Sequence, residues 1–409
     1  MMRKTSLRLK NMDAVHGFLR EETWAAPIKV LHNDEEARPG YESMKRHEYN
    51  EVPDTLHAKV QVLAQLLRNS TNAIVYTGAG ISTASGIKDY ATKMESSTIA
   101  RNRPKITSNM SALPTFAHHA VTALHREEIV KYWIQQNHDG LPQKAGFPQK
   151  YINEIHGAWY DPSNPVVKFS GDLRDDYFED ILEWEERTDL CIAMGTSLSG
   201  MNCDRVVETV GEKARHGQEG CLGAVIIGIQ RTRLDNISAL RIFAPIDDVM
   251  ELLLSALSIE SRVPRALVPQ PYDVPLIPEV TEGTTACFGK VAENTFQIPY
   301  SKETGLLQNN GNGTIIDLST GAQVKLTAGP YEGDVGTVEG RTATGHYKLR
   351  FTHNTKKKSG KTVREQRLRT MGFWWVDGAV KGEVHMFPVM NVSSRAPPTR
   401  STKMVKKKK

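Results

Sequence analysis

Short apolar runs alternate with segments of helical periodicity from about residue 54 to residue 257. Apolar side chains recur every three or four residues in 56–67 and again after Pro114, as on one face of a helix. The runs between such segments contain β-branched residues and have the length of buried strands. They cover residues 73–76, 129–135, 189–194, 224–229 and 240–243. This alternation predicts a Rossmann-like α/β domain built on a parallel sheet.

The pattern changes after residue 278 to short β-like runs separated by glycine turns, which predict a small β domain. Residues 322–351 are similar to a KOW-type or SH3-like barrel. We therefore expect five segments along the chain. They are an N-terminal extension (1–50), an α/β domain (51–260), a proline-rich linker (261–280), a small basic β domain (281–395) and a lysine-rich tail (396–409).

Composition narrows the class of protein. With 409 residues, 39% of them hydrophobic, the chain can bury a sizeable core. No C-x-x-C pair occurs among its four cysteines, so the spacing predicts neither a disulfide framework nor a zinc site, and a reducing compartment fits best. No apolar run approaches the length of a membrane span, and the N-terminus lacks the apolar region of a secretory signal. We expect a soluble intracellular protein without a metal site or a membrane partner.

The first predicted strand runs directly into Gly78, Ala79 and Gly80. Glycines at such a turn allow the backbone to approach a pyrophosphate closely. Residues 81–85 could then open a helix whose free N–H groups face the anion, with the Ser82 hydroxyl as a further donor. No glycine follows three residues after Gly80, so the spacing departs from the dinucleotide fingerprint. The turn favours a nucleotide site, and an ordinary strand-to-helix turn remains the alternative.

Polar side chains follow the second predicted strand, at Gln136, Asn137, His138 and Asp139. Side chains at the carboxyl ends of strands in an open α/β sheet face the ligand crevice. His156 comes shortly afterwards, and imidazole suits a general base because its unperturbed pKa lies near the operating pH. For His156 alone a buried structural histidine is the alternative. We expect His138 to be a structural side chain.

Together these segments resemble the sirtuin (Sir2) family. Residues 78–90 are similar to the signature GAG-x-S-x-x-x-G-I-x-D-[FY], residues 136–141 to Q-N-x-D-G-L, and residues 154–157 to E-L-H-G. Residues 195–198 match G-T-S-L. Residues 50–87 and 170–186 are similar to the nuclear, chromatin-associated class IV members, and the whole resemblance covers about residues 48–257.

The resemblance implies an NAD-dependent protein-lysine deacylase that releases nicotinamide and O-acyl-ADP-ribose. In that family the acyl oxygen attacks the anomeric carbon of the ribose as nicotinamide leaves. The resemblance implies that His156 activates a ribose hydroxyl and that Asn137 and Asp139 organise the nicotinamide-ribose side. The second substrate is then an acylated lysine of a protein, with histones as one candidate. The implied NAD contacts are Gly78, Ala79, Gly80, Ser82, Asp89, Tyr90, Gln136, Gly195, Thr196 and Ser197.

Several positions depart from the family pattern. Ala91 stands where the family has arginine, Pro142 where it has histidine, and Gly228 where it has asparagine. The run after His156 contains no cysteine, so the zinc module that sirtuins insert there is missing. Two other functions therefore stay open. One is NAD hydrolysis or mono-ADP-ribosyl transfer, and the other is a catalytically weak NAD-binding module that contacts chromatin or nucleic acid.

Positive charge is concentrated at the C-terminal end. The whole chain has a net charge of +5, but from Arg341 onward 18 Lys and Arg residues face only three acidic residues. Basic runs attract phosphate backbones and also make nuclear import signals, and the nearby Phe373, Trp374 and Trp375 could stack on bases if exposed. A solvated tail and a buried tryptophan pair are the alternatives. We expect a nuclear or cytoplasmic protein, with nucleic-acid or chromatin contact through this region left open.

Overall fold

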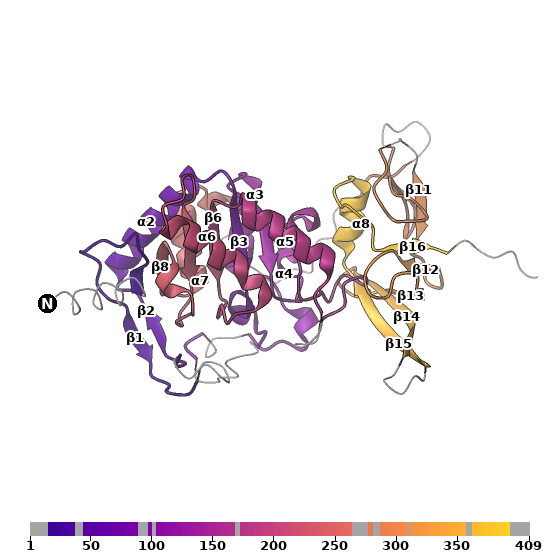
Figure 1. Cartoon of the computed structure of the whole chain (residues 1–409). Helices are drawn as coiled ribbons and strands as arrows, with labels where there is room; N and C mark the ends of the chain where they lie inside the picture. The colour runs from indigo at the N-terminus through magenta and orange to yellow at the C-terminus, as the bar shows by residue number, and fades with distance from the viewer. Residues whose placement is uncertain are drawn as a thin grey trace, which may run out of the picture. The chain divides into compact units, whose positions relative to one another are not determined.

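The computed structural model describes residues 15–36, 44–88, 97–99, 104–167, 172–263, 277–280, 287–309, 311, 313–356 and 362–392. The chain divides into two compact units, residues 1–275 and 276–409, and each has its own sheets (Figure 1). The proline-rich linker falls mostly outside the described residues, and the lysine-rich tail falls wholly outside them. The finer segment boundaries therefore stay predictions.

The first unit is built on a six-stranded parallel sheet with the order β5-β4-β3-β6-β7-β8. Every residue of β3, β6 and β7 is buried, as is typical of parallel strands covered on both faces. The strands are β3 (Ala73–Thr77), β4 (Val130–Gln135), β5 (Ile152–Asn153), β6 (Leu190–Met194), β7 (Gly223–Ile227) and β8 (Leu240–Ile242). The predicted Rossmann-like fold is confirmed, and the strand order reverses between β3 and β6, where ligands bind in such sheets.

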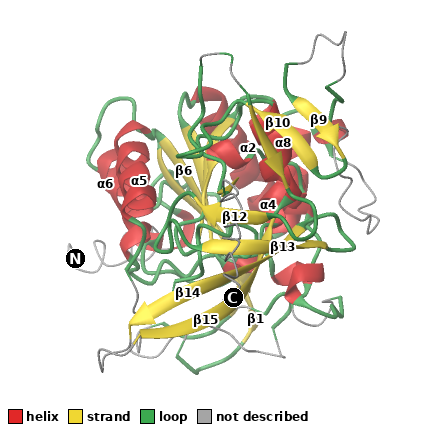
Figure 2. Cartoon of the chain, turned by 90° about the vertical axis from the view of Figure 1, so that its right-hand side faces the viewer, coloured by secondary structure: helices red, strands yellow, loops and turns green. Residues whose placement is uncertain are grey.

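Helices cover both faces of this sheet. Helices α2, α3 and α7 pack on one face, while α5 and α6 lie side by side on the other (Figure 2). Side chains of β3 alternate between the two cores, with Val75 in the first and Ile74 in the second. The helices are α2 (Pro53–Asn69), α3 (Phe116–Arg126), α4 (Leu141–Lys144), α5 (Asp175–Arg187), α6 (Arg205–Arg215) and α7 (Ile246–Ala256).

The turn after β3 differs from the prediction. Instead of a helix over 81–85, two short 3-10 turns follow each other, η1 (Ala79–Ile81) and η2 (Thr83–Ser85). The N–H of Gly80 is already bonded to the 195 loop, and Gly86 has a φ of +91°, a left-handed conformation that ends the turn. No α-helical N-terminus is therefore available for an anion within 79–86.

The N-terminal extension contains a hairpin that the sequence pattern did not reveal. Strands β1 (Ile28–Leu31) and β2 (Glu48–Asn50) pair antiparallel. The N–H of Tyr49 donates to the Ile229 carbonyl at 2.8 Å, so β2 lies beside the segment that follows β7. A strand of three residues carries too little periodicity to be predicted.

The second unit is an antiparallel β structure. One sheet has the order β15-β14-β13-β12-β16 and the other β11-β10-β9, and the long β14 and β15 run side by side in Figure 2. The predicted small β domain is thus confirmed, while its similarity to a KOW or SH3 barrel stays a prediction. The strands are β9 (Gly289–Ala292), β10 (Thr295–Ile298), β11 (Thr314–Asp317), β12 (Gln323–Leu326), β13 (Val335–Arg341), β14 (Tyr347–Lys356), β15 (Thr362–Met371) and β16 (Val389–Asn391).

The aromatic cluster of the second unit lies in its interior. Phe373, Trp374 and Trp375 open helix α8 (Phe373–Val380) and are only 3%, 6% and 7% exposed. Stacking on bases would require exposed rings, and the structure shows the alternative, a buried tryptophan pair. In the described part of the chain, no helix is both long and apolar enough to cross a bilayer.

Candidate active site

Three glycines lock the carboxyl ends of β3 and β6 together. The N–H of Gly78 donates to the Met194 carbonyl at 3.2 Å, and that of Gly80 to the Gly195 carbonyl at 2.7 Å. A Cβ on Gly80 would lie 2.6 Å from the Gly195 Cα. Gly195 itself has a φ of +61°, and a Cβ there would lie 2.5 Å from the Ile81 nitrogen. Only glycine fits at Gly80 and Gly195, so the two loops form one backbone-lined edge.

Asp139 and Asn137 tie the end of β4 to this edge. The Asp139 carboxylate is 2% exposed and accepts hydrogen bonds from the Ser82 hydroxyl at 2.7 Å and the Leu141 N–H at 3.0 Å. The Asn137 amide donates to the Gly78 carbonyl at 3.0 Å and to the Ser82 hydroxyl at 3.1 Å. Burial raises the pKa of Asp139, and the bond from Ser82 opposes that rise. Four predicted site residues are thus in direct contact.

His156 is half-buried at the same edge. Its Nδ1 lies 3.2 Å from the Gln136 carbonyl, which can only accept, so Nδ1 carries the proton. The lone pair of the neutral ring is then on Nε2, 3.5 Å from the Sγ of Cys203. Burial lowers the pKa of His156, and the bond to the Gln136 carbonyl partly opposes this. A neutral imidazole with an unprotonated Nε2 has the form that a general base requires.

The contact between His156 and Cys203 is not a nucleophilic dyad. Cys203 is fully buried, and burial, with the neighbouring charge of Asp204, raises the pKa of its thiol to about 11. A nucleophilic cysteine needs a lowered pKa, because the thiolate is the reactive form. The thiol therefore acts as a weak donor to Nε2. Sequence reasoning missed both Cys203 and Asp204, because no spacing rule connects them to His156.

Gln136, expected to contact NAD, has its side-chain amide occupied. The amide nitrogen donates to the Tyr76 hydroxyl at 2.6 Å and to Asp204 Oδ1 at 3.1 Å. The amide oxygen accepts from the Thr196 hydroxyl at 3.1 Å. Ser197, next to Thr196, is exposed at this edge of the sheet. Among Gln136, Thr196 and Ser197, it is Ser197 that is exposed to solvent.

The remaining positions noted in the sequence do not join this group of contacts. Asp89, Tyr90 and Ala91 fall outside the described residues. Nδ1 of His138 lies 2.8 Å from the Gly157 carbonyl, a structural contact. At Gly228 an added Cβ would meet only the Gly195 nitrogen, at 3.9 Å. The position that holds asparagine in the family pattern is therefore open space in this chain.

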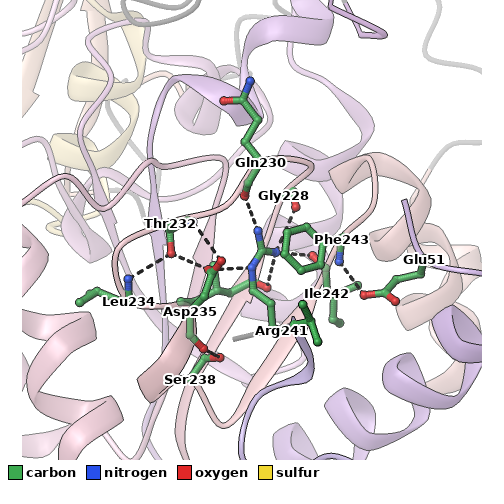
Figure 3. Close-up of polar contacts among 12 residues, drawn as sticks. Glu51, Gly228, Gln230, Thr232, Leu234, Asp235, Ser238, Arg241, Ile242 and Phe243 are labelled. Carbon is green, nitrogen blue, oxygen red and sulfur yellow. Dashed lines mark hydrogen bonds and ion pairs between the residues drawn. The ribbon is translucent and has the colours of Figure 1, made fainter. Parts of the chain in front are cut away.

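A buried guanidinium organises the loop after β7 (Figure 3). Arg241 is fully buried, forms an ion pair with Asp235 at 2.8 Å and stacks 3.6 Å above the ring of Phe243. It also donates to the Gly228 carbonyl at 3.0 Å and to the Gln230 carbonyl. Because Arg offers five donors in a fixed fork, one side chain sets the path of the whole loop.

A compact turn follows His156, where sirtuins insert the zinc module. The N–H of Ala158 donates to the Asn164 carbonyl at 2.9 Å, and the Asn164 amide donates to the Glu154 carbonyl at 2.9 Å. Burial and the charge of Asp161 raise the pKa of Glu154 to about 8. All four cysteines of the chain, Cys191, Cys203, Cys221 and Cys287, are free thiols. Hydrogen bonds to buried polar side chains hold this segment.

One group of ligand-type side chains among the described residues lies on the N-terminal hairpin. His32 Nε2 is 2.9 Å from one oxygen of Asp34, and His47 Nε2 is 3.6 Å from the other. The N–H of Asn33 donates to His47 Nδ1 at 3.1 Å, so the neutral ring carries its proton on Nε2. This Nε2 is the nitrogen that faces Asp34, and because it carries the proton it offers no lone pair to a metal ion. In this cluster His32 forms a hydrogen bond with Asp34, and His47 lies just beyond hydrogen-bonding distance of the same carboxylate.

Comparison with known proteins places the chain beside the sirtuins. No protein-family model matches the chain. The NAD-dependent protein deacetylase sirtuin-7 of Mus musculus is 28% identical over 273 residues, which cover 54% of this chain and 66% of the mouse protein. The NAD-dependent protein deacetylase Sirt6 of Drosophila melanogaster is 41% identical over 105 residues, 25% of this chain and 33% of the fly protein. This chain thus spans just under two thirds of the sirtuin-7 relatives.

A solved structure of Sir2 bound to acetylated peptide is 23% identical, with a TM-score of 0.40, over 49% of this chain and 99% of that chain. The assignment rests instead on the sequence relatives and on the residues themselves. The signature glycines, the Q-N-x-D segment and the histidine of E-x-H-G come from separate strands and meet at one edge of the sheet. The chain is thus similar to the sirtuin family over about half of its length.

Proposed function

We propose that the protein is an NAD-dependent protein-lysine deacylase that releases nicotinamide and O-acyl-ADP-ribose. One observation carries the proposal. The unprotonated Nε2 of His156 lies at the same carboxyl edge as the linked Ser82, Asn137 and Asp139. A base beside a backbone-lined nucleotide edge is the combination that this reaction needs.

The residues at the edge suit NAD. The glycine pair Gly80 and Gly195 leaves backbone without side chains at the sheet end, which allows a pyrophosphate to come close. The exposed Ser197 hydroxyl and the open space at Gly228 leave room for a ribose. NAD supplies an activated anomeric carbon and nicotinamide as its leaving group. Asp89 and Tyr90 are proposed contacts on the strength of the signature alone.

The proposed roles follow from the hydrogen bonds of each side chain. His156 accepts the proton of a ribose hydroxyl at Nε2, in exchange for the weak contact with Cys203. Asn137 and Asp139 hold Ser82, so the turn after β3 keeps its place when nicotinamide is released. Burial keeps the pKa of His156 below its ordinary value, which leaves the ring neutral and ready to accept a proton at neutral pH.

NAD hydrolysis or ADP-ribosyl transfer is the second candidate, and the compact turn after His156 favours it. Without the zinc module a peptide cleft would have a different wall, while Asn137, Asp139 and His156 still match the family motifs. A catalytically weak binding module is the third candidate, since Ala91 and Gly228 both remove side chains that the family pattern uses. Both alternatives use the same cofactor edge.

The partners follow from the same proposal. The second substrate is an acylated lysine in a protein, with histones as one choice. The second unit exposes Arg364 and Arg367 on β15, which supports contact with phosphate backbones. The buried tryptophans remove base stacking from that proposal. Basic runs near the C-terminal end also support a nuclear location, with the cytoplasm as the alternative.

Nicotinamide release from NAD by the purified chain, with and without an acetyl-lysine peptide, tests these functions. Deacylation predicts release only with the peptide and a matching loss of the acetyl group. Release without peptide would replace the proposal with hydrolysis or ADP-ribosyl transfer, and no release under either condition would favour the binding module. His156→Ala serves as the inactive control in each arm.

A further inference from the structure

We propose that Asp204 is a positioning residue that fixes the orientation of His156 and supplies a negative charge near it. The inference rests on the proposed function, because His156 is the general base there. Asp204 lies shortly after residues 199–202, which differ from the apolar, proline-containing sequel of the family's G-T-S-L.

The Asp204 carboxylate is 1% exposed and uses both oxygens. Oδ1 accepts from the Tyr76 hydroxyl at 2.7 Å and from the Gln136 amide at 3.1 Å. Oδ2 accepts from the N–H groups of Gly200 and Met201 at 2.8 Å and 2.9 Å. A buried carboxylate with four donors is well satisfied, so its place and its negative charge are both held firmly.

Two routes connect this carboxylate to His156. Through the first, Asp204 holds the side chain of Gln136, whose backbone carbonyl accepts the Nδ1 proton of His156 at 3.2 Å. Through the second, Asp204 pins the turn that carries Cys203, and the Sγ of Cys203 lies 3.5 Å from His156 Nε2. Both nitrogens of the ring therefore meet groups whose positions depend on Asp204.

The charge of Asp204 also acts on the ring. From the end of β4, the Gln136 carbonyl favours the protonated ring and His138 disfavours it. From the 201–204 turn, Asp204 favours the protonated ring, and the Cys203 thiol facing Nε2 is neutral because its pKa is raised. The Tyr76 hydroxyl on β3 is bonded to Asp204, and burial raises its pKa well above the ordinary value. Removal of the Asp204 charge should therefore lower the pKa of His156 further.

A structural role alone predicts something different. The bonds to Gly200 and Met201 hold the 3-10 turn η6 (Asn202–Asp204) directly before helix α6, so Asp204 also stabilises this local structure. If that were its whole task, Asp204→Asn would reduce the melting temperature and leave the titration of His156 unchanged. A readout on the histidine ring separates the two roles.

The experiment is NMR titration of the His156 ring, assigned by its loss in His156→Ala, in the wild-type full chain and in Asp204→Asn. We expect the pKa of His156 to fall by about half a unit to one unit in the variant. Asp204→Glu should restore most of it. Tyr76→Phe keeps the charge and removes one donor, so it should move the pKa by less than half as much. If Asp204→Asn does not fold, Asp204→Ser replaces it, since serine still accepts from the turn.

An unchanged pKa of His156 in a folded, uncharged variant overturns the proposal. The acid limb of kcat/KM should shift in the same direction as the ring pKa. The titration needs no turnover, so it still reads the role of Asp204 if the wild-type chain releases no nicotinamide. If no nicotinamide is released, the proposed function fails, but the titration still shows whether Asp204 acts on His156.

Discussion

The hydroxyl of Ser82 donates a 2.7 Å hydrogen bond to the buried carboxylate of Asp139. Ser82 follows β3 and Asp139 follows β4, so one bond joins the turns at the ends of two adjacent strands. The same serine oxygen accepts from Asn137. The Ser82 hydroxyl therefore helps to fix the relative position of the nucleotide edge and the polar residues after β4, together with the bond from the Asn137 amide to the Gly78 carbonyl.

Replacement of Asp139 should test this arrangement. Asp139→Asn keeps the shape of the side chain but cannot accept from both Ser82 and Leu141 as a carboxylate does, because one oxygen becomes an N–H donor. We expect a loss of about 1–3 kcal/mol in the free energy of unfolding, together with at least a tenfold loss of nicotinamide release. Urea unfolding and the release assay measure the two effects. Ser82→Ala is the matched control and should reproduce most of the stability loss; an Asp139→Asn protein as stable as wild type would contradict the reasoning.

Removal of the proposed base should leave the fold in place and reduce turnover. For His156→Ala we expect nicotinamide release to fall by about 10²–10⁴-fold, the contribution of a positioned general base. The matched control is His138→Ala, which removes a histidine from the same edge whose Nδ1 contacts the Gly157 carbonyl. It should retain activity within about tenfold of wild type. Equal losses in the two variants would mean that His156 has no special role.

The glycines Gly80 and Gly195 test the nucleotide edge through the backbone. In Gly80→Ala the new Cβ would lie 2.6 Å from the Gly195 Cα, and neither backbone can move without breaking the 2.7 Å bond between them. We expect a loss of about 1–3 kcal/mol in stability and a marked loss of NAD binding. Calorimetric titration with NAD measures the second effect. Gly217→Ala is the control, because an added Cβ meets nothing within 4 Å there, although its φ of +75° carries a small strain. Normal NAD affinity in Gly80→Ala would remove this edge from the site.

How far sequence reasoning reached depended on how local each signal is. The buried strands β3, β6 and β7 can be recognised in the sequence as continuous apolar runs, because both faces of the sheet are covered. The glycine turn and the Q-N-x-D segment were found for the same reason, since each is a short, contiguous motif. The boundaries shifted by one or two residues at most strands.

Features that arise from long-range contact were not predictable. Asp204 and Gln136 are separated by 68 residues, and no local pattern marks the carboxylate that holds the amide. Arg241 looks like an ordinary strand residue until the fold buries it against Asp235. The helix expected at 81–85 was wrong for a similar reason, because the N–H of Gly80 donates to the carbonyl of Gly195, in the loop after β6.

The buried ion pair between Lys59 and Glu51 should contribute strongly to stability. Lys59 donates to the Glu51 carboxylate and to the Arg241 carbonyl, each at 2.6 Å, and both charged side chains are fully buried. In Glu51→Gln the lysine charge loses its partner inside the protein, so we expect unfolding to become easier by about 3–5 kcal/mol in urea. The double variant Glu51→Gln with Lys59→Met should recover part of this loss. Glu208→Gln breaks a half-exposed pair with Arg233 and should cost less than about 1 kcal/mol; equal effects at the two pairs would show that burial does not matter here.

The raised pKa of Glu154 predicts how stability depends on pH. Its pKa is about 8 in the folded chain, mainly because of burial and then because of the charge of Asp161, against 4.5 in an exposed side chain. Between these values the folded state holds a proton that the unfolded state has lost, so the contribution of Glu154 to stability is complete below pH 4.5 and is lost as the pH rises through 8. Glu154→Gln has the shape of the protonated acid and no charge to bury. The free energy of unfolding of the variant, relative to that of wild type, should therefore increase by a few kcal/mol, at most about 5, from pH 4.5 to pH 8.5. Urea unfolding at both pH values measures this difference. Asp172→Asn, an exposed acid outside the cluster, controls for general charge effects, and parallel pH profiles for wild type and Glu154→Gln would show that Glu154 is ionised in the folded protein.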